Sequence, residues 1–120
     1  MEDLKPHYER NIFKDGKIKL KKRIKEISEI LKNNNVEFYL VIFPFAETLE
    51  YEQDKFSWEN YGEEMCNIDN CNFINAFDIF KRERKNNKNW NSDLFFTADV
   101  HYNYGGNKLL AEILSQKIFN

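Results

Sequence analysis

The sequence contains few of the residues that mark linkers, disordered segments or disulfide scaffolds. Its 120 residues include only 4 Gly, 2 Pro and 2 Cys, which excludes a collagen-like or linker-rich chain. An excess of one charge is lacking too, because 18 basic residues are offset by 20 acidic ones. A dedicated nucleic-acid binder carries a clear basic excess, and no apolar run approaches the ~20 residues of a membrane span. We therefore expect no nucleic-acid partner and no membrane span.

Hydrophobic residues, by contrast, are plentiful, and many are aromatic. They make up 42% of the chain and aromatic residues alone 16%, beside 32% charged residues. This composition is globular, and the length suits one core. We expect residues 1–120 to form a single domain or a partial domain.

The two cysteines, Cys66 and Cys71, lie five positions apart. Two thiols without a nearby histidine cannot form a four-ligand zinc site. Two interpretations stay open. The thiols are free and flank a strand, or they form a local disulfide, which would indicate an oxidising compartment.

An amphipathic helix is predicted from residue 17 to about residue 32. Gly16 precedes it and the triplet Asn33–Asn35 ends it. Its apolar positions follow helical spacing: Leu20, Ile24, Ile27 and Leu31.

Two segments are predicted to be strands. Val36–Phe43 is almost continuously apolar and stops at Pro44, which is typical of a parallel strand buried on both faces. Asn72–Asn75 is the second strand. A central strand with one partner would leave an apolar edge exposed. We therefore expect further sheet strands from the rest of the protein, or a homo-oligomer.

The other segments complete an α/β pattern. Helices are predicted near 54–66, at about 77–85 and at about 104–118, and residues 90–97 are expected to be irregular or extended. The last helix has a clear apolar stripe: Leu109, Leu110, Ile113, Leu114 and Ile118.

The motif with the most chemical content is Asp99-Val100-His101-Tyr102-Asn103, in a loop just before the last helix. A carboxylate so placed can accept a hydrogen bond from the imidazole Nδ1–H, fix the tautomer and stabilise the imidazolium. Nε2 can then take a proton from a hydroxyl nucleophile. Asn103 is a good N-cap for the helix that follows.

These residues resemble the C-terminal block of the SGNH/GDSL hydrolase superfamily. That block usually reads Asp-x-x-His; the shorter Asp-x-His resembles the branch related to alginate O-acetyltransferases. The matching residues are Asp99, His101, Tyr102, Asn103 and Gly105 or Gly106. The order of elements over about 17–118 is also similar, but only to the second half of the family domain.

The resemblance implies a three-layer α/β/α fold with a mainly parallel sheet, and ester hydrolysis or acyl transfer on an acylated carbohydrate or another ester. It implies Asp99 and His101 as catalytic residues, no cofactor, no metal, and a setting in the cell envelope or periplasm for a longer exported protein. The family's nucleophilic serine follows the first strand. The serines here are Ser28, Ser57, Ser92 and Ser115, and none matches. The nucleophile is therefore expected outside this chain.

Two alternatives and one further candidate residue stay open. A non-catalytic α/β module would bind a partner or a carbohydrate through Tyr102, Tyr104 and Trp90. Asp99 and His101 would otherwise be metal ligands, although the downstream sequence offers few more. Glu47, just after the first strand and Pro44, stands where α/β proteins place ligands.

Overall fold

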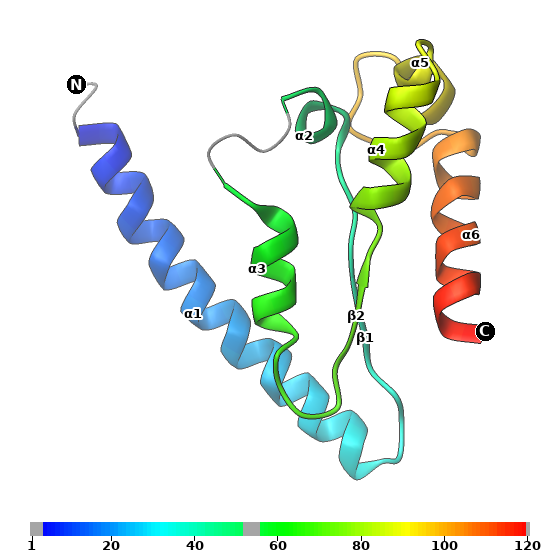
Figure 1. Cartoon of the computed structure of the whole chain (residues 1–120). Coiled ribbons are helices and arrows are strands. Elements are labelled where there is room, and N and C mark those ends of the chain that lie inside the picture. Colours follow the sequence, from blue (N-terminus) through cyan, green and yellow to red (C-terminus); the bar gives the residue numbers. More distant parts are fainter. Residues whose placement is uncertain (1–3, 52–55, 120) are drawn as a thin grey trace. The chain divides into compact units, whose positions relative to one another are not determined.

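The structure is a computed structural model that describes residues 4–51 and 56–119, with side chains from residue 14 onward. It is 63% helical and contains a two-stranded parallel sheet, so the predicted α/β class is confirmed at this level. None of the helices in these ranges combines the length and the hydropathy that crossing a membrane requires. The elements in chain order (Figure 1) are α1 Leu4–Asn33, β1 Tyr39–Ile42, α2 Ala46–Glu50, α3 Trp58–Met65, β2 Asn72–Asn75, α4 Phe77–Asn86, α5 Trp90–Leu94 and α6 Tyr104–Phe119.

The chain divides into two compact units. The first comprises residues 1–38 and 65–72, and the second comprises residues 39–64 and 73–120. That residues 1–120 form one domain or a partial domain stays a prediction.

In the first unit, α1 is longer than predicted and continues through Gly16, which was expected to precede the helix. A side chain at Gly16 would meet nothing within 4 Å, so this glycine has no packing role. The predicted end is confirmed. Asn35 has a φ of 58°, its amide donates to Lys32 O at 3.0 Å, and the amide of Val36 donates to Leu31 O at 2.8 Å. This is a Schellman motif, in which asparagine takes the left-handed position.

Of the four positions predicted to form the apolar stripe of α1, only Ile24 is buried. Ile24 is 6% exposed, whereas Leu20 and Ile27 are 44% and 45% exposed. The buried neighbour of Ile24 along the helix is Ser28, whose hydroxyl donates to the carbonyl oxygens of Asp69 and Asn70. Within this unit, the segment that packs on α1 is residues 65–72. Because this segment is short, it covers only a narrow strip of the helix surface.

Cys66 and Cys71 form a disulfide within this unit, with Cα atoms 5.4 Å apart. Of the two interpretations left open by the sequence, the free thiols are therefore wrong. The disulfide closes the turn between α3 and β2, a turn in which Asn70 has a φ of 54°.

The sheet pairs β1 with β2 in parallel (Figure 1). The register is set by hydrogen bonds from Asn72 N to Phe38 O and from Ala76 N to Ile42 O, both 2.9 Å. The strand predicted at Val36–Phe43 is shorter in the structure, and its four residues are half-buried rather than buried on both faces. Among the described residues, β1 has one neighbouring strand and is therefore an edge strand, which leaves it less covered than a central strand.

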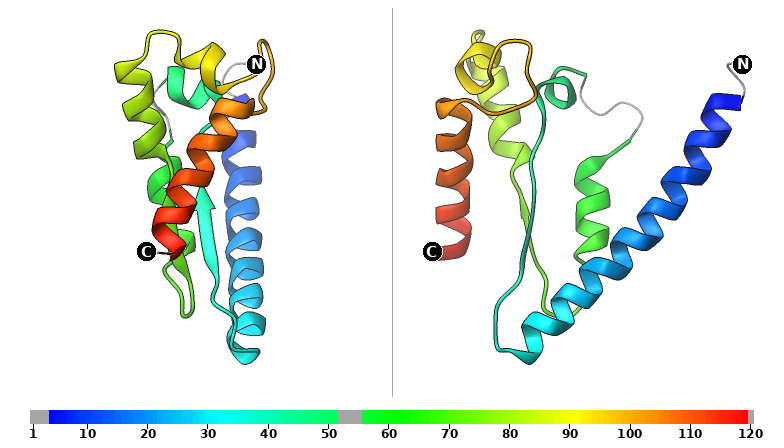
Figure 2. Two further views of the ribbon diagram at one scale, coloured as in Figure 1. Left: turned by 90° about the vertical axis from the view of Figure 1, so that its right-hand side faces the viewer. Right: turned by 180° about the vertical axis from the view of Figure 1, so that it is seen from behind.

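The second unit has its core where α4, α5 and α6 meet (Figure 2). Val41 of β1 packs against this core, whereas Gly62 of α3 lies against the side chains of Ile42 and Phe73. A Cβ on Gly62 would overlap both, so the close approach of α3 requires glycine. The buried residues of the core cluster are Leu49, Ala76, Phe80, Leu94, Phe95 and Ile113.

Predicted and observed elements agree best where the pattern is long. The helices predicted at 77–85 and 104–118 and the strand Asn72–Asn75 are confirmed. The helix predicted at 54–66 begins at Trp58, because the Ser57 hydroxyl accepts a hydrogen bond from the Asn60 amide at 3.1 Å and caps the first turn. Residues 54 and 55 lie outside the described residues. α2 was not predicted, and α5 was wrongly expected to be irregular or extended.

Candidate functional site

The loop between α5 and α6 carries both predicted catalytic residues. An isolated antiparallel bridge joins Phe95 to Tyr102, and the Phe96 amide donates to His101 O at 3.2 Å, so the loop folds back on itself. Ala98 lies at its tip with a φ of 56°, a conformation that costs free energy for a residue with a Cβ. Strained residues of this kind concentrate at functional sites.

The loop brings Asp99 and His101 into direct contact. The Asp99 Oδ1 atom is 2.6 Å from His101 Nδ1, and it also accepts a hydrogen bond from the His101 amide at 3.1 Å. The hydrogen bond to His101 holds the pKa of the Asp99 carboxyl below its ordinary value. The His101 side chain is 75% exposed. A carboxylate on Nδ1 selects the tautomer with Nδ1–H, which leaves the lone pair on Nε2 facing solvent.

Tyr102 anchors this loop to the end of β1. Its hydroxyl donates to Pro44 O at 2.6 Å, and its ring stacks on Phe80 with a centroid distance of 5.0 Å. The edge of a second ring, Phe95, completes the enclosure at 5.1 Å. Burial raises the pKa of the Tyr102 hydroxyl. Because Pro44 lies two residues after the end of β1, the Asp99–His101 pair is tethered near the carboxyl end of the sheet.

The residues after Tyr102 fix the other end of the loop. The Asn103 side chain accepts from the Gly106 amide at 3.1 Å, which is the predicted N-cap, and donates to Phe95 O at 3.1 Å. A Cβ on Gly105 would overlap Asp93 O, and one on Gly106 would overlap Leu94 O and Tyr102. Both glycines therefore let α6 start against the end of α5. The Tyr-Asn-x-Gly-Gly pattern thus has a structural reason in this chain.

A pocket of about 310 Å³ lies beside Asp99. It opens between α2 and the tip of the loop, at the carboxyl end of β1, where open α/β sheets place their ligands. Its charged lining residues are Glu47, Glu50 and Asp99, so it favours a neutral or cationic group over an anion. The full lining is Phe45, Ala46, Glu47, Thr48, Glu50, Asn91, Ala98, Asp99 and Val100.

Sequence reasoning found part of this pocket. Glu47 was singled out because it follows β1 and Pro44, and it does line the pocket with Asp99. The contribution of the rest of α2 was missed, because a helix of five residues leaves no periodic pattern. No residue type in the motif indicated that Tyr102 would reach Pro44, since that contact spans 58 positions of sequence.

The serines of the second unit are Ser57, Ser92 and Ser115, and none of them forms a hydrogen bond with His101 in the described residues. Ser28 is buried against the 69–70 turn, Ser57 caps α3, and the Ser92 hydroxyl donates to Asn89 O at 3.2 Å. Ser115 lies on the exposed part of α6. In the second unit, the described residues thus place an imidazole beside a carboxylate, with no serine hydroxyl hydrogen-bonded to either.

The structure also bears on the two alternative interpretations, carbohydrate binding and metal binding. Of the three aromatic residues proposed to bind a carbohydrate, Trp90 and Tyr102 pack against the core cluster, and only Tyr104 is exposed, at 82%. Over the described part of the chain, no group of three or more His, Cys, Asp or Glu side chains is placed to hold a metal ion.

Comparison with known proteins gives this chain no family. A scan against protein-family models, a search of curated proteins and a search of solved structures each found no match. The likeness to SGNH hydrolases therefore rests on the motif residues and on the order of the elements.

Proposed function

We propose that this chain is the C-terminal part of an SGNH-like acyl hydrolase or O-acyltransferase that acts on an acylated carbohydrate or another ester. The observation that carries the proposal is the 2.6 Å contact between Asp99 Oδ1 and His101 Nδ1 in an exposed loop before the last helix. The pocket of about 310 Å³ beside Asp99 supports it, because ligand pockets begin near this size.

The chemistry would run through a serine hydroxyl contributed from outside this chain. His101 Nε2 takes the hydroxyl proton while the serine oxygen bonds to the ester carbonyl carbon. The imidazolium, stabilised by Asp99, then gives that proton to the leaving alkoxide as the ester bond breaks. Water or a carbohydrate hydroxyl, deprotonated by the same nitrogen, then bonds to the acyl carbon. The bond from that carbon to the serine oxygen breaks, and the imidazolium returns the proton to the serine oxygen. No step needs a metal or a cofactor.

The proposal extends to the fold and the compartment. A three-layer α/β/α domain requires more strands than β1 and β2, and these would precede the present chain. The Cys66–Cys71 disulfide fits a protein that folds in an oxidising setting such as the cell envelope.

A second candidate is a non-catalytic α/β module. The observation that favours it is that, among the described residues of the second unit, no serine forms a hydrogen bond with His101. Such a module would bind a neutral or cationic group in the pocket beside Asp99 without changing it.

A fluorophosphonate probe, which labels activated serines, tests the proposal by intact-mass spectrometry. The folded chain alone should take up no stoichiometric label. A longer form that carries the preceding strands should take up one label per chain. His101→Ala should slow that labelling and ester turnover by about 10²-fold or more.

The matched control is His7→Ala, which removes the other histidine and should label like the parent protein. Full labelling of His101→Ala would rule out His101 as the base. A longer form with an intact His101 that takes up no label would favour the non-catalytic module.

A further inference from the structure

The charge of the chain is unevenly distributed, and one strongly basic stretch lies in α1. The whole chain carries a formal net charge of -2, but residues 14–25 include seven basic residues and one acidic residue, Asp15. The structure forms this stretch as one continuous helix (Figure 1). A nearly neutral chain therefore presents a strongly basic surface on a single helix.

Four lysines share one face of this helix with an isoleucine. Counted from Ile18, positions i−4, i+3, i+4 and i+7 lie on the same side of a helix. These positions are occupied by Lys14, Lys21, Lys22 and Lys25. We call these five residues the lysine face. All of them are exposed, and Ile18 is 61% exposed.

The lysines of the lysine face form no ion pair with any residue that the structure describes. Arg23 of the same helix, by contrast, is paired with Glu26 at 2.9 Å. Like charges three and four positions apart destabilise a helix, as Lys21 and Lys22 do with Lys25. A surface of opposite charge would relieve this repulsion.

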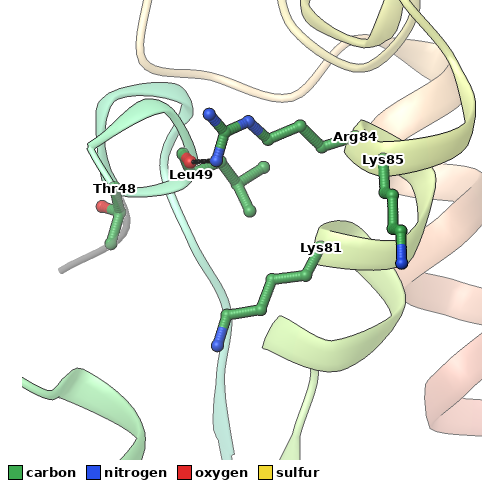
Figure 3. Close-up of a pocket in the computed structure, with 5 residues that line it drawn as sticks. All are labelled: Thr48, Leu49, Lys81, Arg84 and Lys85. Carbon is green, nitrogen blue, oxygen red and sulfur yellow. Dashed lines mark hydrogen bonds between the residues drawn. The ribbon is translucent and has the colours of Figure 1, made fainter.

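The basic residues of α4 differ, because the fold itself engages them. The Arg84 guanidinium donates to Leu49 O beside a pocket of about 570 Å³ between α2 and α4 (Figure 3). Lys81 pairs with Glu59 at 2.5 Å. The lysine face of α1 thus offers cations that the described residues leave to a partner.

We propose that the lysine face of α1 binds the surface of an anionic lipid bilayer. Clusters of about four to eight basic residues on an amphipathic helix are typical of such binding. The basic residues of the face are all lysines, whose compact charge suits the diffuse charge of lipid headgroups, whereas an arginine fork suits a single phosphate.

Ile18 favours a bilayer over a nucleic acid as the partner. An exposed apolar side chain among lysines can enter the boundary between headgroups and acyl chains. A phosphate backbone, which attracts lysines equally well, offers no apolar medium to an isoleucine. The lysine face includes no residue of the Asp99–His101 site, so this proposal does not rest on the proposed function.

Flotation of the full chain with lipid vesicles on a density gradient tests the surface. We expect the chain to float with vesicles of phosphatidylcholine and phosphatidylglycerol, less so as sodium chloride is added, and not with phosphatidylcholine alone. Protein aggregates sink, so self-association does not imitate binding. Lys22→Gln combined with Lys25→Gln should weaken the affinity about 30-fold, because each lysine near an anionic surface contributes about fivefold.

The matched control is Lys88→Gln combined with Lys108→Gln, which removes the same charge from exposed positions of the second unit and should leave the affinity unchanged. Failure to float with the anionic vesicles, or an equal loss in both lysine pairs, would overturn the lysine face as the binding surface.

A second pair of variants tests the bilayer against other polyanions. Ile18→Ser should weaken the affinity about fivefold, because the variant no longer buries an apolar side chain. Ile30→Ser should not, although Ile30 is equally exposed at 62%, because it lies a third of a turn around the helix from Ile18. An Ile18→Ser variant that binds like the parent chain would overturn the bilayer as the partner and indicate a general polyanion surface.

Discussion

At the scale of the residue, one hydrogen bond between Asp99 and His101 sets which imidazole nitrogen faces solvent. The carboxylate contacts the imidazole nitrogen nearest the backbone, and the rest of the His101 ring stays in solvent. The motif predicted this pairing, because two residues of separation let a carboxylate reach back to the ring. The motif does not predict the partner of Nε2, because that partner depends on which chain segments lie opposite the loop.

The Asp99 carboxyl gives the first test at this scale. Its pKa is lowered from the ordinary value of 3.8, chiefly by the hydrogen bond from the His101 ring and then by the one from the His101 amide. His101→Ala removes the first and keeps the second. We therefore expect the pKa of Asp99 to rise in this variant, without returning fully to 3.8. Carboxyl carbon chemical shifts, followed by NMR against pH, measure it.

The lowered pKa of Asp99 also determines how its contribution to stability changes with pH. A carboxyl whose pKa is lower in the folded state stabilises the fold above its unfolded pKa, and this contribution is lost as the pH falls through the folded value. The control is Asp69, whose pKa is lowered by Lys32 and should not respond to His101→Ala. An unchanged pKa of Asp99 in the variant would mean that the contact does not persist in solution.

At the scale of the element, helices of several turns were predictable and the two helices of five residues were not. α4 and α6 carry enough turns for their apolar spacing to be read, and β2 lies between clear breaks. α2 and α5 have five residues each and are held by contacts distant in sequence, such as the Arg84 bonds to the end of α2. Gly16 misled the prediction for α1, because a glycine in an exposed helix costs only about 1 kcal/mol against alanine.

Gly106 and Gly16 both lie in helices, and together they test whether packing requires a glycine at one position and not at the other. Gly106→Ala places a Cβ against Leu94 O and Tyr102, so we expect a loss of about 2 kcal/mol in the free energy of unfolding. Gly16→Ala meets nothing within 4 Å and should gain about 0.5–1 kcal/mol from helix propensity. Urea denaturation followed by circular dichroism measures both. Equal effects at the two positions would mean that α6 does not start against α5.

At the scale of the whole molecule, the decisive feature is the edge of the sheet. The described residues form two strands, and β1 has the apolar sequence Tyr-Leu-Val-Ile. Phe38 and Ile42 bond to the β2 side, so Val41, at the odd position between them, directs its amide toward the other edge. An apolar edge of this kind pairs with any available strand. The motif and the class of fold could be predicted from the sequence, whereas the described residues contain no further strand that pairs with this edge.

We therefore expect the chain by itself to self-associate through β1. Val41→Pro should reduce the association and leave the fold, because proline is tolerated on an edge strand when the lost amide faces outward. Ile42→Pro removes an amide on the β2 side instead and should cost about 3 kcal/mol or more. Light scattering over a range of protein concentrations reports the association, and circular dichroism reports the fold. A wild-type chain that stays monomeric at every concentration would contradict an open edge, and it would weaken the proposal that preceding strands belong beside β1.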